Sequence, residues 1–179
     1  PTPCTSPPTN IPVTVTKIPT AATVTPVAPA VCDGASQTFS ITNITGGNGP
    51  YTYQWEQLSP ATGAVWTNIT GATAATHTVT GTLALNGYKY RVKISAPPCV
   101  GSFTSTEGTL TVNPNPTVTL AATDLAITPG QTTTLTATSN PAAVSYRWTL
   151  NGATVSGITG NTLVVSNIDD VGAYRAEAT

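Results

Sequence analysis

The sequence predicts an all-β protein of two tandem sandwich domains, on the evidence of its length, its strand pattern and one repeated strand. The chain has 179 residues, which suits two small β domains. Short runs rich in threonine and valine are separated by turns containing Gly, Pro and Asn, as in antiparallel β proteins. The clearest run, residues 85–99, puts Tyr90 and Val92 on one face and Arg91 and Lys93 on the other.

This strand is repeated near the other end of the chain. Tyr174-Arg175-Ala176 repeats Tyr90-Arg91-Val92, and it follows the pattern D-x-G-x-Y, in which Asp170 is the acid and Tyr174 the tyrosine. The pattern resembles the tyrosine corner that opens strand F of immunoglobulin-like sandwiches. The core position two residues after each tyrosine is not a cysteine, so neither domain can form the antibody-type disulfide. We therefore expect two immunoglobulin-like domains, with Tyr90, Tyr174 and Asp170 as structural residues.

The first domain is predicted to follow the strand order of this fold. The expected strands are A at 22–27, B at 37–41, C at 51–55, a C′-like strand at 65–69, E at 76–83, F within 85–99 and G at 108–112, with a turn at 32–34 between A and B. Asn86-Gly87 supplies a tight turn before strand F. Trp55 ends the Y-x-W pattern of strand C, and Trp148 ends the same pattern in the second domain. Both indoles are expected to be buried, each at the centre of its own sandwich.

The second domain follows the linker N-P-N-P at residues 113–116, which lacks most backbone donors and favours an extended path. Its expected strands are A at 118–120, B at 133–137, C at 144–150, E at 162–165 and F at 172–179, with a hairpin turn at Asn151-Gly152. No strand G follows within the sequence. Its counterpart is I-P-V-T-V-T at residues 11–16, which the proline confines to an edge or strand-start position.

These observations predict a particular division of the chain. Residues 1–17 would contribute strand G to the second domain of a preceding copy, residues 18–113 would form the first domain, and residues 114–179 would form a second domain that lacks its own strand G. A disordered linker rich in Pro and Thr is the alternative interpretation of residues 1–20. Because the chain opens on P-T-P-C without a methionine, we expect a processed or excised piece of a longer protein.

Two motifs of the first domain are specific enough to suggest a family. They are W-x-N-I-x-G-A-T at residues 66–73 and N-G-Y-K-Y-R-V at residues 86–92. With the second repeat, they resemble over essentially the whole chain the Ig-like tandem repeats of large Bacteroidota cell-surface or gliding-type adhesins, which are exported by type IX secretion. The resemblance implies an extracellular, cell-surface stalk, fibre or adhesin.

The composition excludes several classes of function. Six basic and seven acidic residues leave a net charge of −1, so nothing favours binding to nucleic acid or to an anionic membrane. There is no apolar run of transmembrane length, and no signal-peptide pattern. The only histidine, His77, has no cysteine or carboxylate at ligand spacing, and Asp169-Asp170 lacks the further oxygen ligands of a calcium loop. We expect no enzymatic activity, no cofactor and no metal.

The three cysteines are an odd number, so at least one is free or pairs outside the chain. Cys32 precedes the start of strand B and Cys99 follows the end of strand F. These strands run in the same direction in this fold, so no bond between the two is expected. The spacing from Tyr90 to Cys99 recurs when the sequence is read from Tyr174 into residues 1–4 of a following copy. A Cys4–Cys32 bridge is therefore the candidate disulfide, with Cys99 as the odd thiol.

The function expected from these features is mechanical. The chain would be a structural repeat unit of an extracellular bacterial fibre or surface adhesin, in which head-to-tail Ig-like domains give length and stiffness. Its partners would be copies of itself, joined as a covalent array or by strand donation. Neither nucleic acid nor a membrane is expected as a partner. The alternatives are a carbohydrate- or protein-binding module and an accessory domain of a secreted hydrolase. Trp66, Tyr51 and Tyr88 would be the sugar platform of the first alternative, although aromatic residues on such strands more often pack in the core.

Overall fold

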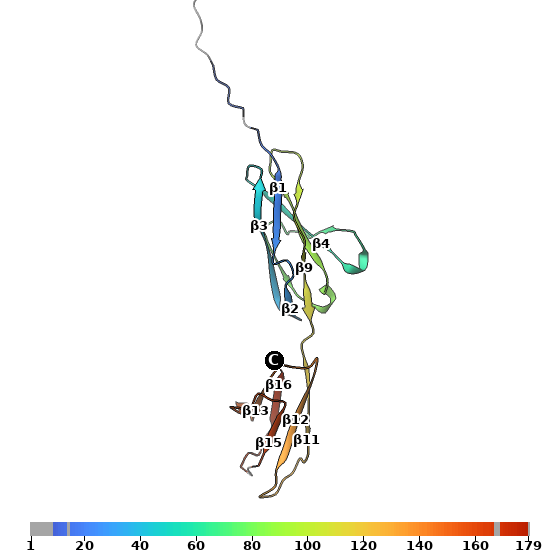
Figure 1. Cartoon of the computed structure of the whole chain (residues 1–179), viewed down its shortest axis with the longest axis vertical. Helices are drawn as coiled ribbons and strands as arrows, with labels where there is room; N and C mark the ends of the chain where they lie inside the picture. Colours follow the sequence, from blue (N-terminus) through green and yellow to red (C-terminus); the bar gives the residue numbers. More distant parts are fainter. Residues whose placement is uncertain (1–8, 14, 167–168, 179) are drawn as a thin grey trace, which may run out of the picture. The chain divides into compact units, whose positions relative to one another are not determined.

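The computed structural model describes residues 9–13, 15–166 and 169–178, and the regular structure in this part is all β apart from two short 3-10 turns. The contacts divide the chain into two compact units, residues 1–113 and residues 114–179, called unit 1 and unit 2 below (Figure 1). Each unit is a sandwich whose two main sheets are antiparallel. The fold is therefore all-β, as the sequence predicts.

Unit 1 contains ten strands and both 3-10 turns. The strands are β1 (Pro19–Thr25), β2 (Ala30–Cys32), β3 (Ser36–Gly46), β4 (Thr52–Leu58), β5 (Thr67–Asn68), β6 (Thr76–Thr80), β7 (Lys89–Ser95), β8 (Phe103–Thr104), β9 (Gly108–Thr109) and β10 (Thr111–Asn113). The turns are η1 (Pro60–Thr62) and η2 (Leu83–Leu85). One main sheet has the order β1-β3-β6, and the other has the order β5-β4-β7-β8 with β9 also on β7; β2 and β10 form a separate pair of parallel strands.

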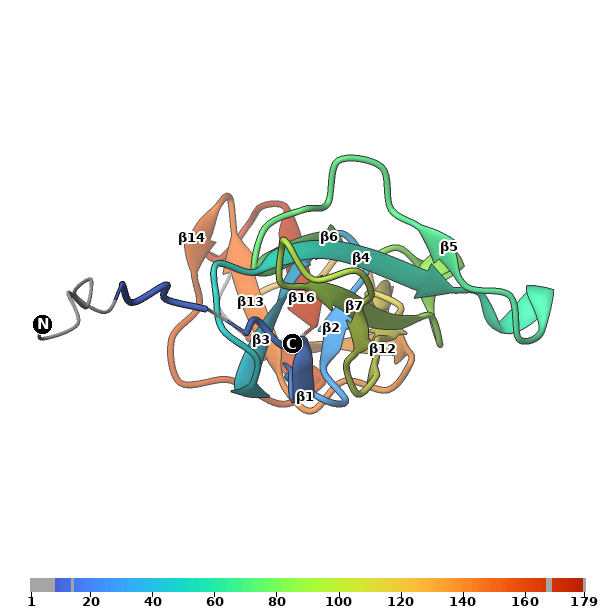
Figure 2. The same ribbon diagram turned by 90° about the horizontal axis from the view of Figure 1, so that it is seen from above.

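The core of unit 1 lies between these two sheets. Alternation on β7 buries Tyr90, Val92 and Ile94, which is the face predicted from the sequence. Phe39 on β3 meets them from the opposite sheet and is also fully buried. The β4–β5 hairpin, with η1 at its tip, projects from the sandwich in both views (Figures 1 and 2).

Several boundaries in unit 1 differ from the prediction. Cys32 lies in β2, which pairs in parallel with β10, and not in a turn. The C′-like strand is reduced to β5, and strand E ends at Thr80 because the chain turns into η2. Residues 11–13, 15 and 16 form no strand within this chain, and their expected pairing with a preceding copy stays a prediction.

Unit 2 has a shorter set of strands. They are β11 (Thr117–Ala122), β12 (Thr133–Asn140), β13 (Tyr146–Leu150), β14 (Ala153–Thr154), β15 (Thr162–Val165) and β16 (Tyr174–Ala178). The two sheets have the orders β11-β12-β15 and β14-β13-β16. Asn151 and Gly152 have φ of 50° and 87°, so the predicted hairpin turn between β13 and β14 is confirmed. The buried core is Ala137, Trp148, Leu163 and Val165.

Candidate functional site

The two tryptophans of the Y-x-W patterns occupy equivalent positions. Trp55 and Trp148 are both fully buried, and each lies opposite the residue that follows the repeated Tyr-Arg pair, Val92 in unit 1 and Ala176 in unit 2. Each indole Nε1 donates a hydrogen bond of 2.9 Å to a backbone carbonyl, that of Ala74 or of Gly160. The buried ring thus has its single polar group satisfied, which makes it a structural anchor and not a reactive group.

The two repeated tyrosines differ in their hydroxyl groups. Tyr174 Oη donates to the carbonyl oxygen of Asp170 at 2.8 Å, the hydrogen bond of a tyrosine corner. Burial and, to a lesser extent, the nearby charge of Asp170 raise the pKa of Tyr174. Tyr90 is fully buried with its ring stacked on Phe39 at 4.9 Å, and its hydroxyl has no partner in the described part of the chain. Burial, with a smaller contribution from Tyr88, raises the pKa of Tyr90 to about 12.

We expect opposite results when the two hydroxyls are removed. Tyr174→Phe should lower the free energy of unfolding of unit 2 by about 1 kcal/mol, because the corner hydrogen bond is lost. Tyr90→Phe should leave unit 1 equally stable or more stable, because a desolvated hydroxyl without a partner is removed. Urea denaturation of the two variants checks this, with native-state hydrogen exchange assigning each change to its unit. A loss in Tyr90→Phe equal to that in Tyr174→Phe would contradict it.

An ionic cluster covers the outer face of the β4–β7 pair, and the sequence analysis did not find it. Glu56 is only 3% exposed although it lies on the outer face, next to the inward-pointing Trp55. Arg91 Nε lies 2.8 Å from Glu56 Oε2, and Lys93 Nζ lies 2.7 Å from Glu56 Oε1. Burial alone would raise the pKa of Glu56, but the hydrogen bonds and charges of Lys93 and Arg91 outweigh it and lower that pKa below its ordinary value.

The three aromatic residues considered for a sugar platform are not brought together. Tyr51 precedes β4 and Tyr88 precedes β7, and because these strands are antiparallel the two rings lie at opposite ends of the pair. Both rings pack against the core of unit 1. The guanidinium carbon of Arg91 lies 4.0 Å from the ring centroid of Trp66, so a cation already occupies one face of that ring.

His77 is a strand residue beside the core. Its ring is 5.8 Å from the ring of Trp55 and 6.1 Å from that of Tyr90, measured between centroids, and burial lowers the pKa of His77. Among the described residues, no three of His, Cys, Asp and Glu come together as metal ligands.

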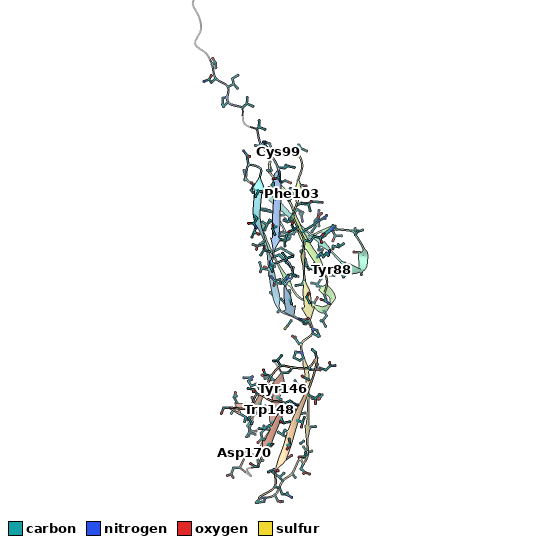
Figure 3. All side chains as sticks on the ribbon, in the orientation of Figure 1. Tyr88, Cys99, Phe103, Tyr146, Trp148 and Asp170 are labelled. Carbon is teal, nitrogen blue, oxygen red and sulfur yellow. The ribbon has the colours of Figure 1, made fainter. Side chains whose placement is uncertain are left out.

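The cysteines of unit 1 are far apart. Cys32 is exposed in β2, whereas Cys99 follows β7 at the other end of the sandwich, where the Cys99 thiol lies 3.0 Å from Thr16 Oγ1 (Figures 1 and 3). Neither Cys32 nor Cys99 forms a disulfide within the described residues. Cys4, the candidate partner of Cys32, lies outside the described residues.

Unit 2 has an open apolar groove of about 480 Å³. Its lining comes from residues 120–122 of β11, residues 124–127 of the segment that follows, Thr133 and Leu135 of β12, Val165 of β15, and residues 170–172 and 174 around the start of β16. Figure 3 labels Asp170 and Trp148 in unit 2, with Asp170 lower in the view. Two of the predicted site residues, Asp170 and Tyr174, line this groove.

Comparison with known families identifies unit 1. Residues 20–114, which span β1 to the end of β10, match a family model described as Domain of unknown function (DUF8696). The chain belongs to this family. No curated protein matches the sequence.

Solved structures with a similar fold are chains of Ig domains. They include the four N-terminal Ig domains of Dscam1 isoform 8.4 (16% identity, 84% of this chain and 39% of that chain covered, TM-score 0.40). Murine CEACAM1b (16% identity, 89% and 91% covered, TM-score 0.42) and the amphioxus IgVJ-C2 molecule (18% identity, 84% and 92% covered, TM-score 0.36) are similar to the same extent. Such low identities carry no information on what this member of DUF8696 binds.

The described part of the chain also contains no helix that is long and apolar enough to cross a membrane.

Proposed function

We propose that this DUF8696 chain is a structural repeat unit of an extracellular bacterial fibre or surface adhesin. The observation that carries the proposal is an arrangement repeated in the two units, in which a buried tryptophan lies opposite the residue that follows the Tyr-Arg pair of the neighbouring strand. Each unit has its own core and its own satisfied indole, so further copies can be added without redesign of either.

The chemistry of the described surface supports a mechanical role over a binding or hydrolytic one. Both carboxylate oxygens of Glu56 are paired, one with Arg91 and the other with Lys93. The guanidinium of Arg91 also covers one face of the Trp66 ring. A sugar-binding module would need convergent, free aromatic faces. Tyr51, Tyr88 and Trp66 do not meet in that way, so the fibre or adhesin repeat is the function that this arrangement favours.

The proposal is tested on intact cells of the source organism. An antibody raised against the purified chain should label unpermeabilised cells in immunogold electron microscopy, with label distributed along surface material, and the epitope should disappear after protease treatment of whole cells. A cytosolic protein serves as the control that the cells are intact. Label found only after lysis would contradict the proposal. A glycan array on which the chain binds one glycan class tightly would favour the binding-module alternative instead.

A further inference from the structure

Two segments of unit 1 that are far apart in its sequence are bonded directly to each other. β2 runs parallel to β10, and Val31 lies opposite Val112 at the centre of the pair. The backbone hydrogen bonds between these segments extend beyond the pair in both directions. They run from the Thr109 N–H to the Val27 carbonyl at 2.8 Å, from the Thr111 N–H to the Pro29 carbonyl at 2.9 Å, and from the Asp33 N–H to the Asn113 carbonyl at 2.9 Å. Residues 27–33 and 109–113 are called the clasp below.

The later segment of the clasp is also held on its other side. The Leu110 N–H donates to the Tyr88 carbonyl at 2.9 Å, and the Val112 N–H donates to Asn86 Oδ1 at 2.9 Å. The N–H groups of residues 109–112 therefore point alternately to the earlier segment of the clasp and to the turn before β7. Because all four of these donors are bonded, this segment cannot leave unit 1 unless hydrogen bonds on both sides break.

The centre of the clasp is shielded from water. Val112 is 3% exposed, and Val31 packs against the core of unit 1. The backbone at Gly81 covers this valine pair, because a Cβ placed on Gly81 would lie 2.7 Å from Val31 Cγ2 and 3.4 Å from Val112 Cγ2. Hydrogen bonds that are screened from solvent are stronger than exposed ones, and water cannot readily replace them one at a time.

The path of the chain decides how tension would load the clasp. The chain enters unit 1 at Pro19, where β1 begins, and leaves it at Asn113, at the opposite end of the unit (Figure 1). Tension would therefore pull β2, through β1, toward the end of the unit where β1 begins, and would pull β10 toward the other end. Since the two strands are parallel, they would have to slide past each other along their length. Such sliding loads all the hydrogen bonds of the clasp together, whereas strands that are peeled apart from one end lose their bonds one at a time.

We infer that the clasp is the load-bearing contact of unit 1, which keeps this unit folded when the chain is stretched. This role rests on the proposed mechanical function and names the contact that carries the force. In an array of repeats each unit is stretched through its two connections to the chain, so its resistance to force depends on the contact between its early and late segments. In unit 1 that contact is the clasp, which is held by backbone hydrogen bonds and by the Val31–Val112 pair.

The experiment stretches the full 179-residue chain between two handles in optical tweezers. The two units are told apart by the length that each releases, since unit 1 has more residues than unit 2. Thr111→Pro removes the donor of the hydrogen bond to Pro29, and Thr111 is exposed, so no core side chain is lost. The force at which unit 1 unfolds should fall to about half of the wild-type value or less, because forced unfolding reports the barrier to unfolding and not the equilibrium stability. The force for unit 2 should not change.

Two matched comparisons separate the clasp from the general stability of unit 1. Thr62→Pro also removes the backbone donor of an exposed threonine, but this donor bonds to Ser59 in the β4–β5 hairpin, outside the clasp, so the force should not change. Val31→Ala should lower the force for unit 1, whereas Val92→Ala should lower it much less. Val92 is fully buried on β7, so its truncation should cost at least as much equilibrium stability, which urea denaturation measures.

A folded Thr111→Pro chain whose unit 1 unfolds at the wild-type force would overturn the load-bearing role of the clasp. If circular dichroism shows that Thr111→Pro does not fold, the two valine variants decide the question. Equal forces in Val31→Ala and Val92→Ala, or a lower force in Val92→Ala, would then overturn that role. An unchanged force together with surface label on intact cells removes only the load-bearing contact, whereas a lowered force without surface label removes the proposed function and leaves the contact.

Discussion

Trp148→Ala is expected to unfold unit 2, and Trp55→Ala is expected to lower the free energy of unfolding of unit 1 by about 3–5 kcal/mol. Both indoles are fully buried, and each loses its packing together with one hydrogen bond, to Gly160 or to Ala74. Among the described residues, the core of unit 2 contains four buried side chains. Small domains are marginal in stability, so a loss of this size exceeds the free energy of unfolding that such a core supplies. Circular dichroism under urea denaturation measures the total, and amide hydrogen exchange assigns the loss to one unit.

Trp66→Ala is the matched control for these two variants. Trp66 is half-exposed on the outer face, where it contacts the guanidinium of Arg91, so its removal should cost about 1 kcal/mol or less. If all three tryptophan variants lost the same stability, burial would not be what distinguishes Trp55 and Trp148. Retained exchange protection throughout unit 2 in Trp148→Ala would likewise contradict the prediction.

The parts of the fold that follow from local pattern were predictable from the sequence. Alternation identifies the buried face of β7, and Asn151-Gly152 identifies the β13–β14 turn, because both depend only on neighbours in the chain. The parallel pairing of β2 with β10 was not predictable in the same way. It joins segments about eighty residues apart, and β2 is too short to show a period of its own.

The repeated Tyr-Arg pair shows a second limit of sequence pattern. Tyr90 and Tyr174 stand at equivalent positions, yet only Tyr174 forms the corner hydrogen bond. The residue four positions earlier differs, Asn86 in unit 1 and Asp170 in unit 2. Asn86 Oδ1 accepts a hydrogen bond of 2.9 Å from the Val112 N–H, so this turn of unit 1 is held against β10. In unit 2 the turn is held by the hydrogen bond from Tyr174 to Asp170.

The Glu56 cluster could not have been assigned from the sequence either. Glu56 follows Trp55 on an alternating strand, so its pattern predicts an ordinary outward residue. Its burial depends on the register of β4 against β7, which places Arg91 directly opposite, and on the length of the Arg91 and Lys93 side chains. The alternation of inward and outward residues within one strand does not show which residue of a distant strand will lie opposite.

Glu56→Gln is expected to lower the free energy of unfolding of unit 1 by about 2 kcal/mol at neutral pH. The carboxylate is 3% exposed and accepts from both Arg91 and Lys93, so the amide leaves two cations facing each other without their common anion. Replacement of one member of a fully buried ion pair costs more, but Arg91 and Lys93 are 22% and 42% exposed, so water relieves part of the loss.

The effect of Glu56→Gln should also depend on pH in a defined direction. The pKa of Glu56 is lowered in the folded state from its ordinary 4.5, so the unfolded state binds this proton first. The stabilisation is therefore complete above about pH 4.5 and is lost as the pH falls through the lower folded-state pKa. Urea denaturation across this range should give free energies of unfolding for the wild type and Glu56→Gln that converge in acid.

Glu107→Gln is the control, because Glu107 is 42% exposed in its 2.8 Å pair with Lys89 and should contribute about 0.5 kcal/mol or less at any pH. Equal losses in the two variants would show that the outer-face cluster is no more than an ordinary surface pair.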